Sequence, residues 1–229
     1  NIRVGISSAG GDMVCSAVLS LKRSKYINFE IFAFNSIENP IMRKVADTFA
    51  ILPKGDDPTY AEITLEHAHR YNLDVFVPWS DEEALVLSQY GDLLEADGCS
   101  LLASDTATLN LISNKAATYC LLRDAGITVP DHLLVRNFDE LRHAAKNFGY
   151  PKQTVIVKPS VSRGGRGVKI LLGEDPPEAW IGKGQREDIE GIYTFLQKVC
   201  NSVRQNSCFP RASAGYDHNW ALSLSQALL

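Results

Sequence analysis

The chain has 229 residues, of which 45% are hydrophobic and 22% are charged, and its formal net charge is −4. This is the composition of an ordinary globular protein. The negative net charge argues against a general nucleic-acid-binding surface, but it does not exclude a local basic loop. No apolar run approaches the length of a membrane-spanning helix. The five cysteines are odd in number and form no CxxC pair, which favours a reducing, cytoplasmic setting over a disulfide framework.

Strands and helices are expected to alternate through the first hundred residues. Short apolar runs predict strands at 2–7, 29–34, 49–52, 73–78 and 101–103, and helical periodicity predicts helices from the glycine turn at 9–11 to residue 24, at 59–72 and at 81–95. Such alternation is typical of a parallel sheet with helices on both faces. The predicted fold class of this part is therefore α/β, with a doubly wound parallel sheet in a Rossmann-like domain.

A different order of elements follows. A helix is predicted at 105–123, then a strand at 133–135, and then a helix that begins at Asn137 with Glu140 in a capping-box-like arrangement. Strands at 154–158 and 168–172 are expected to pair as a hairpin. Because this order differs from that of the first hundred residues, we predict a boundary near 105–113, which gives domains 1–108 and 109–229, the second of them α+β.

The last part of the chain is less regular. After residue 172 the sequence is polar and rich in proline and glycine, which indicates a loop. Helical patterns then predict a helix at 189–203 and an amphipathic helix at 219–229, with Asp217 as its cap.

The stretch VIVKPSVSRGGRGVKI, at 155–170, contains a lysine at a strand end followed by a basic, glycine-rich loop. Proline forces the preceding Lys158 toward an extended backbone. Glycines let backbone N–H groups approach a polyanion closely, and Arg163 and Arg166 add forked cationic donors. The pattern predicts a clamp for nucleotide phosphates. It is neither a GxxxxGK[ST] loop nor a GxGxxG turn, and the alternative is a mobile hairpin tip whose arginines are merely solvated.

A second lysine strengthens the phosphate interpretation. Ser113 or Asn114 is expected to cap a helix that has Lys115 in its first turn. A cation there opposes the helix dipole, so the position is slightly costly unless an anion binds. The alternative is an ordinary surface lysine with its stem packed on the protein.

Four stretches in this order resemble the ATP-grasp superfamily, most of all its carbamoyl-phosphate-synthase large-subunit-like members. They are RVGISSAGGDMVCSAVLSLKRS, LDVFVPWSDEEALVLSQY, NKAATYCLLRDAGITVP and VIVKPSVSRGGRGV. The resemblance covers residues 1–172, and the combination is much more specific than any one stretch.

The resemblance implies a pre-ATP-grasp domain followed by an ATP-grasp domain that holds ATP between two lobes. It implies a ligase in which ATP activates a carboxylate as an acyl phosphate, which an amine, ammonia or a thiol then attacks. The implied cofactors are ATP and Mg²⁺, with Mn²⁺ as an alternative metal, since cations must neutralise charge at the transferred phosphoryl group. The implied partners are small-molecule carboxylates and amines, with no nucleic acid and no membrane, and a homo-oligomer stays open.

By position in the matching motifs, the resemblance also implies site residues. The implied nucleotide-binding residues are Lys115, Lys158, Ser162, Arg163, Gly164, Gly165, Arg166 and Gly167. Those from Ser162 onward would form a lid over the phosphates. Pro210 and Arg211 resemble the family's terminal Pro-Arg, which makes Arg211 the expected catalytic residue.

The sequence departs from the family where metal ligands are expected. Ser207 and Phe209 occupy the positions of a Glu-x-Asn motif ahead of Pro-Arg, and neither can replace a magnesium-binding carboxylate or amide. Against the family pattern, a middle section is also missing between about residues 173 and 210, so the metal ligands stay unknown. We favour a complete enzyme of which segments are omitted here. The alternative is a non-catalytic, nucleotide-binding or regulatory relative, while an NAD-binding oxidoreductase has little support.

Several other residues have both a functional and a structural interpretation. His67 and His69 are predicted to be surface residues rather than metal ligands. The acidic residues at 81–83 suit the dipole at a helix start, so structure alone accounts for them. The loop at 7–11 is a candidate anion site, and Trp79, after a predicted strand, is a candidate for lining a ligand crevice.

Overall fold

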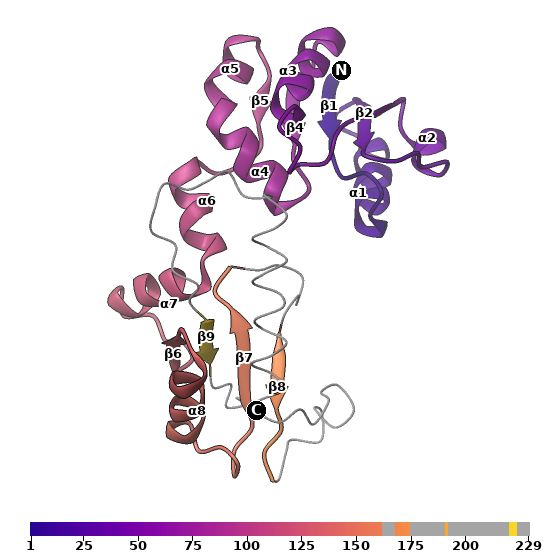
Figure 1. Ribbon diagram of the computed structural model, residues 1–229. Coiled ribbons are helices and arrows are strands. Elements are labelled where there is room, and N and C mark those ends of the chain that lie inside the picture. Colours follow the sequence, from indigo (N-terminus) through magenta and orange to yellow (C-terminus); the bar gives the residue numbers. More distant parts are fainter. Residues whose placement is uncertain (162–167, 175–190, 192–219, 224–229) are drawn as a thin grey trace. The chain divides into compact units, whose positions relative to one another are not determined.

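The computed structural model describes residues 1–161, 168–174, 191 and 220–223. The chain divides into two compact units, Asn1–Asn110 and Leu111–Leu229, and each is described by itself (Figure 1). Within the described residues, none of the helices has both the length and the apolar character that crossing a membrane requires.

The first unit is built on a parallel sheet with the strand order β3-β2-β1-β4-β5. Its strands are β1 (Ile2–Ile6), β2 (Phe29–Asn35), β3 (Thr48–Ile51), β4 (Val75–Val77) and β5 (Ser100–Leu101). From β1 the chain adds β2 and then β3 on one side of the sheet. It then returns to add β4 and β5 on the other side of β1. The carboxyl ends of β1 and β4 therefore form the point where the strand order reverses, which is where open α/β sheets place ligands. The predicted doubly wound sheet is confirmed.

Helices cover both faces of this sheet. They are α1 (Asp12–Lys22), α2 (Met42–Val45), α3 (Tyr60–Tyr71), α4 (Asp81–Leu87) and α5 (Gly91–Ala96), with a 3₁₀ turn, η1 (Ser88–Tyr90), between the last two. One buried cluster contains Ile31 and Ala33 of β2 with α1 and α2, and the other contains Phe32 and Phe34 with α3, α4 and α5. Successive side chains of a strand point to opposite faces, so β2 contributes to two cores and is apolar from Ile31 to Phe34.

Gly5 lies in a closely packed part of this sheet. A Cβ atom at this position would lie 2.6 Å from Leu73 Cδ1 and 2.8 Å from a ring carbon of Phe76. Both neighbours are buried, so neither can move away without disturbing the core. Glycine in β1 is therefore a packing requirement.

The second unit contains a four-stranded sheet with the order β6-β9-β7-β8, in which all described pairs are antiparallel. Its strands are β6 (His132–Val135), β7 (Val155–Pro159), β8 (Lys169–Leu171) and β9 (Trp220–Ser223), and its helices are α7 (Lys115–Asp124) and α8 (Phe138–Asn147). Helix α6 (Thr106–Ser113) crosses the division between the units. The predicted hairpin of β7 and β8 is confirmed, with Ile156 opposite Ile170.

The core of the second unit lies between α8 and one face of the sheet. Val155 and Val157 of β7 are fully buried there, together with Leu141 and Ala145 of α8. Asn137 caps α8 by accepting the N–H of Glu140, as predicted. Because side chains alternate along a strand, Lys158 belongs to the other face of β7, away from this core.

The predicted helix at 219–229 is wrong in its first part, because Trp220–Ser223 is strand β9. This strand lies between β6 and β7 and pairs with both of them, so that Leu222 is opposite Leu133 on one side and Val157 on the other. Two neighbouring strands offer hydrogen bonds to the segment's backbone, and this tertiary pairing outweighs a local helical pattern. The proposed cap Asp217 and the predicted helix at 189–203 lie outside the described residues.

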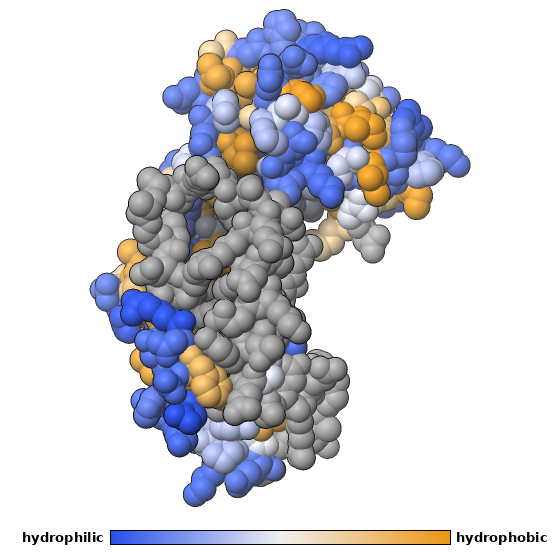
Figure 2. Space-filling view, viewed as in Figure 1, coloured by the Kyte–Doolittle hydropathy of each residue, from blue (hydrophilic) through white to orange (hydrophobic). Residues whose placement is uncertain are grey.

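The surface of the first unit is mixed in polarity. Figure 2 shows hydrophobic residues in patches between hydrophilic ones on the visible face of this unit. Large exposed hydrophobic side chains include Met13, Tyr26, Ile37 and Ile41. Scattered exposure of this kind is common on folded proteins and does not by itself identify a site.

Candidate functional site

Lys158 lies at the carboxyl-terminal part of β7 and is held by a tyrosine from α7. Its Nζ donates a hydrogen bond of 2.8 Å to the hydroxyl oxygen of Tyr119. The same Nζ lies 4.9 Å from the centroid of the Tyr119 ring, within the range of a cation–π contact. The ammonium group of a long, flexible side chain thus has a defined position on the half-buried face of the sheet.

Lys115 begins α7 next to the same strand end. The Asn114 side chain caps the helix by accepting the N–H groups of Ala116 and Ala117. The Lys115 backbone N–H donates to the Ser160 carbonyl at 2.8 Å, and Asn114 forms an antiparallel bridge with Val161. The structure therefore brings the start of α7 against the segment that follows Lys158.

The predicted helix at 105–123 is interrupted at this point. It consists of α6 and α7, and Asn114 between them has an extended backbone with φ −98° and ψ 99°. That break lets Asn114 pair with Val161 while its side chain caps α7. The interruption is thus what ties the lysine-bearing helix to β7.

The expected lid, Ser162–Gly167, lies outside the described residues, and so does Arg211. Val161 and Val168, which flank the lid, are described, as is the β7–β8 hairpin that carries it. Of the sequence-derived site residues, the structure therefore places Lys115 and Lys158.

Sequence reasoning missed Tyr119. Its spacing of four from Lys115 puts both residues on one face of α7, a signal that the sequence did contain. The Tyr119 ring also lies 5.1 Å from the His132 ring, centroid to centroid. His132 Nε2 is 4.0 Å from Cys120 Sγ, and its Nδ1 is 3.2 Å from the Pro130 carbonyl oxygen. The His132 ring thus packs against Tyr119.

In the first unit, a buried polar network occupies the point where the strand order reverses. The hydroxyl of Ser7, directly after β1, donates to Glu83 Oε2 at 2.8 Å and accepts the Trp79 N–H at 3.2 Å. Ser80 and Glu83 form a reciprocal capping box at the start of α4. Glu83 is only 5% exposed, so the prediction that 81–83 merely suit a helix dipole is incomplete.

This network also limits the candidate anion site at 7–11. The Ser7 hydroxyl is engaged by Glu83, and the Gly10 N–H donates to Asn35 Oδ1 at 3.1 Å. The Ala9 N–H donates to the Phe34 carbonyl at 2.9 Å. These groups serve to hold the loop, so they are not directed at a ligand.

Tyr60 lies beside this network, and its hydroxyl is buried without a hydrogen-bond partner among the described residues. Burial, followed by the negative charge of Glu83, raises the pKa of Tyr60 well above its ordinary value, so the phenol stays neutral. An unpaired buried hydroxyl costs free energy relative to its hydration in the unfolded chain.

Replacing Tyr60 by phenylalanine should therefore leave the free energy of unfolding unchanged or raise it by up to about 1 kcal/mol. The matched control is Thr64→Val, because the Thr64 hydroxyl donates to the Tyr60 carbonyl at 2.7 Å and its loss should be destabilising. Thermal unfolding of the two variants against the wild type measures both effects. A loss of more than about 1 kcal/mol in Tyr60→Phe would show that the hydroxyl does have a partner.

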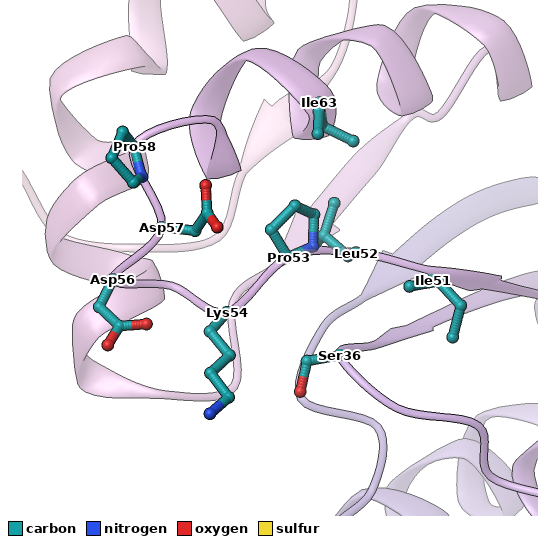
Figure 3. A pocket seen from close by; sticks show the side chains of 9 residues that line it. All are labelled: Ser36, Ile51, Leu52, Pro53, Lys54, Asp56, Asp57, Pro58 and Ile63. Atoms are coloured by element: carbon teal, nitrogen blue, oxygen red, sulfur yellow. The ribbon is translucent and has the colours of Figure 1, made fainter.

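Two pockets open on the first unit. One, of about 670 Å³, lies beyond the ends of β2 and β3, with Ser36, Lys54, Asp56 and Asp57 in its polar part (Figure 3). The other, of about 630 Å³, is lined mainly by apolar side chains of β1, β4 and α1, and Trp79 contributes to it. Trp79 thus lines an apolar hollow at this place.

No group of three or more His, Cys, Asp or Glu side chains that could hold a metal gathers in the described residues. His69 is exposed and pairs with Asp97 at 2.8 Å, as a surface residue would. His67 is half-buried, with its ring 5.2 Å from that of Phe34, so it is partly exposed and packs on the edge of the core. Burial lowers the pKa of His67, which favours the neutral ring.

Comparison with known proteins connects this geometry to a family. The model of the carbamoyl-phosphate synthase L chain, ATP binding domain, matches residues 115–193. The carbamoyl phosphate synthase large chain of Mycobacterium sp. (strain JLS) is 34% identical over 88 residues, which is 38% of this chain and 8% of that protein. The large chain of Rubrobacter xylanophilus is 29% identical over 126 residues, or 55% of this chain and 11% of that protein.

Solved structures share the fold over nearly the whole chain. The biotin carboxylase domain of Hydrogenobacter thermophilus 2-oxoglutarate carboxylase has a TM-score of 0.62 at 19% identity, covering 96% of this chain and 43% of that one. Biotin carboxylase from Campylobacter jejuni has a TM-score of 0.63 at 16% identity, covering 97% of this chain and 45% of that one. The chain spans less than half of these proteins. The family resemblance of the sequence is thus confirmed: residues 115–193 match the model of the carbamoyl-phosphate synthase L chain, ATP binding domain, and the chain shares its fold with the biotin carboxylase domains.

Proposed function

We propose that this chain is a nucleotide-binding part of an ATP-dependent ligase of the ATP-grasp type. Residues 1–108 are the pre-ATP-grasp domain and residues 109–229 belong to the ATP-grasp domain. The reaction is activation of a carboxylate as an acyl phosphate, followed by attack of an amine, ammonia or a thiol. The observation that carries the proposal is the joining of α7 to the end of β7, with Lys158 held at that end, inside the matched segment.

The donors at this place suit a polyphosphate. A lysine ammonium has three N–H donors, and the contact with Tyr119 uses one of them. The hairpin of β7 and β8 carries between its strands a segment with three glycines and two arginines, which are the residues that wrap phosphate oxygens. The proposed nucleotide-binding residues are Lys115, Lys158, Ser162, Arg163, Gly164, Gly165, Arg166 and Gly167, and Arg211 is the proposed catalytic residue.

Mg²⁺ is the proposed metal, with Mn²⁺ as an alternative. A divalent cation bound with ATP neutralises charge on the transferred phosphoryl group. Among the described residues, no group of three or more His, Cys, Asp or Glu side chains is placed to hold this metal. The Hydrogenobacter thermophilus domain was crystallised in complex with magnesium ADP, which supports this pairing by analogy.

The proposed partners are small molecules, namely a carboxylate and an amine or ammonia. A homo-oligomer is also proposed as an option, since the Hydrogenobacter thermophilus domain is described as a dimer. A cytoplasmic location is proposed as well, and the odd number of cysteines without a CxxC pair supports it.

The proposal is tested by calorimetric titration of the chain with ATP in the presence of Mg²⁺. Saturable binding is expected for MgATP and much weaker binding for adenosine, because the proposed clamp acts on the phosphates. Equal binding of both ligands, or no binding of either, would contradict the proposal.

A non-catalytic nucleotide-binding relative is the second candidate, and Ser207 and Phe209 at the expected ligand positions favour it. For this candidate, ATP should bind equally well with Mg²⁺ and with EDTA. The ligase instead requires that chelation weakens binding of the nucleotide.

A further inference from the structure

We propose that Tyr119 is a positioning residue that holds the Lys158 ammonium for the nucleotide phosphates, an inference that rests on the proposed function. The 2.8 Å hydrogen bond to the hydroxyl and the 4.9 Å approach to the ring centroid act on the same nitrogen. The hydroxyl sets the direction of the ammonium group, and the ring provides a second, electrostatic contact.

Tyr119 can serve this purpose because it is itself held in place. It lies one turn after Lys115 on α7, whose first residues are tied to β7 through Ser160 and Val161. The His132 ring lies 5.1 Å from the Tyr119 ring, centroid to centroid. Helix, strand and histidine thus fix the tyrosine, and the tyrosine fixes the lysine.

Holding the Lys158 side chain in place before binding reduces the conformational entropy that is lost when an anion binds. A free lysine side chain has four rotatable bonds, and ordering it on binding costs part of the interaction energy with an anion. An ammonium group that is already placed over Tyr119 avoids much of that cost. It also keeps two N–H donors, so phosphate oxygens can bind without displacing the tyrosine.

Tyr119→Phe tests the hydroxyl apart from the ring, because phenylalanine lacks the hydroxyl but keeps the ring that contacts His132 and the Lys158 ammonium. We expect MgATP binding to weaken about fivefold, which corresponds to the loss of one net hydrogen bond. In a Lys158→Ala background the same change should have no effect, as measured by ligand-observed NMR. A purely structural role of Tyr119 would give the same loss in both backgrounds, and that result would overturn the inference.

A second measurement needs no nucleotide. The acetylation rate of Lys158 by acetic anhydride, followed by mass spectrometry, should rise about fivefold in Tyr119→Phe, because the amine is no longer held by the hydroxyl. Tyr150→Phe is the matched control, since Tyr150 packs on the core of the same unit. An unchanged acetylation rate would overturn the assignment. If the wild type fails to bind MgATP, the proposed function falls, while this rate still decides whether Tyr119 holds Lys158.

Discussion

Replacing Lys158 by alanine should weaken MgATP binding by about 10- to 100-fold, the equivalent of one charge-assisted hydrogen bond to a phosphate. The reason is the placement of this ammonium: it lies on the half-buried face of β7, where an ion pair is less screened than at the open surface. Removal also leaves the Tyr119 hydroxyl without its partner. Isothermal titration with ATP and Mg²⁺ measures the change.

Lys152→Ala is the matched control for this experiment. Lys152 is an exposed lysine of the same unit that precedes β7, so its removal changes the net charge equally. Its MgATP affinity should stay within about twofold of the wild type, since exposed charges contribute little. If both variants lose affinity to the same extent, a general charge effect is responsible and Lys158 has no specific role at the phosphates.

Replacing Glu83 by alanine should lower the free energy of unfolding of the first unit by about 3 kcal/mol. The Glu83 carboxylate accepts the Ser7 hydroxyl at 2.8 Å and the Ser80 N–H at 3.2 Å. Both donors lose their acceptor in the variant, in surroundings where Ser7 is fully buried. The side chain is also closely packed, because a Cβ atom on Gly55 would lie 2.8 Å from Glu83 Cγ.

Since the chain has two units, the measurement must report on the first one. Hydrogen exchange of the β1 and β4 amides as a function of urea gives the local free energy of opening. Asp81→Ala is the matched control, because Asp81 is an exposed acid in the same first turn of α4. It should cost no more than about 1 kcal/mol through the helix dipole. Equal losses in the two variants would mean that only helix electrostatics are involved.

The candidate site was partly predictable from local patterns. The Lys158-Pro159 pair at the end of a β-branched run and the glycine-rich segment after it are contiguous in the sequence. Asn114 and Lys115 were also recognisable as a helix start. The spacing of four between Lys115 and Tyr119 was visible in the sequence, but the role of Tyr119 was not, because it depends on a hydrogen bond across 39 positions of the chain.

Glu83 and β9 are two further features that depend on contacts between distant parts of the chain. Glu83 reads as one of three acids at a helix start, and only its contact with Ser7, 76 positions away, makes it a buried structural group. Trp220–Ser223 follows a helical pattern locally, yet it becomes a strand because β6 and β7 both pair with it. Local propensity is weak compared with two rows of backbone hydrogen bonds.

The sequence by itself determined the alternation of strands and helices in the first unit, the β7–β8 hairpin and the residue types suited to a polyphosphate. These depend on periodicity and on neighbouring residues, which are written along the chain. The tertiary structure alone decided which strand lies between β6 and β7, which acid is buried, and which side chain holds Lys158. Those outcomes are set by contacts between distant segments, whose energies no local pattern contains.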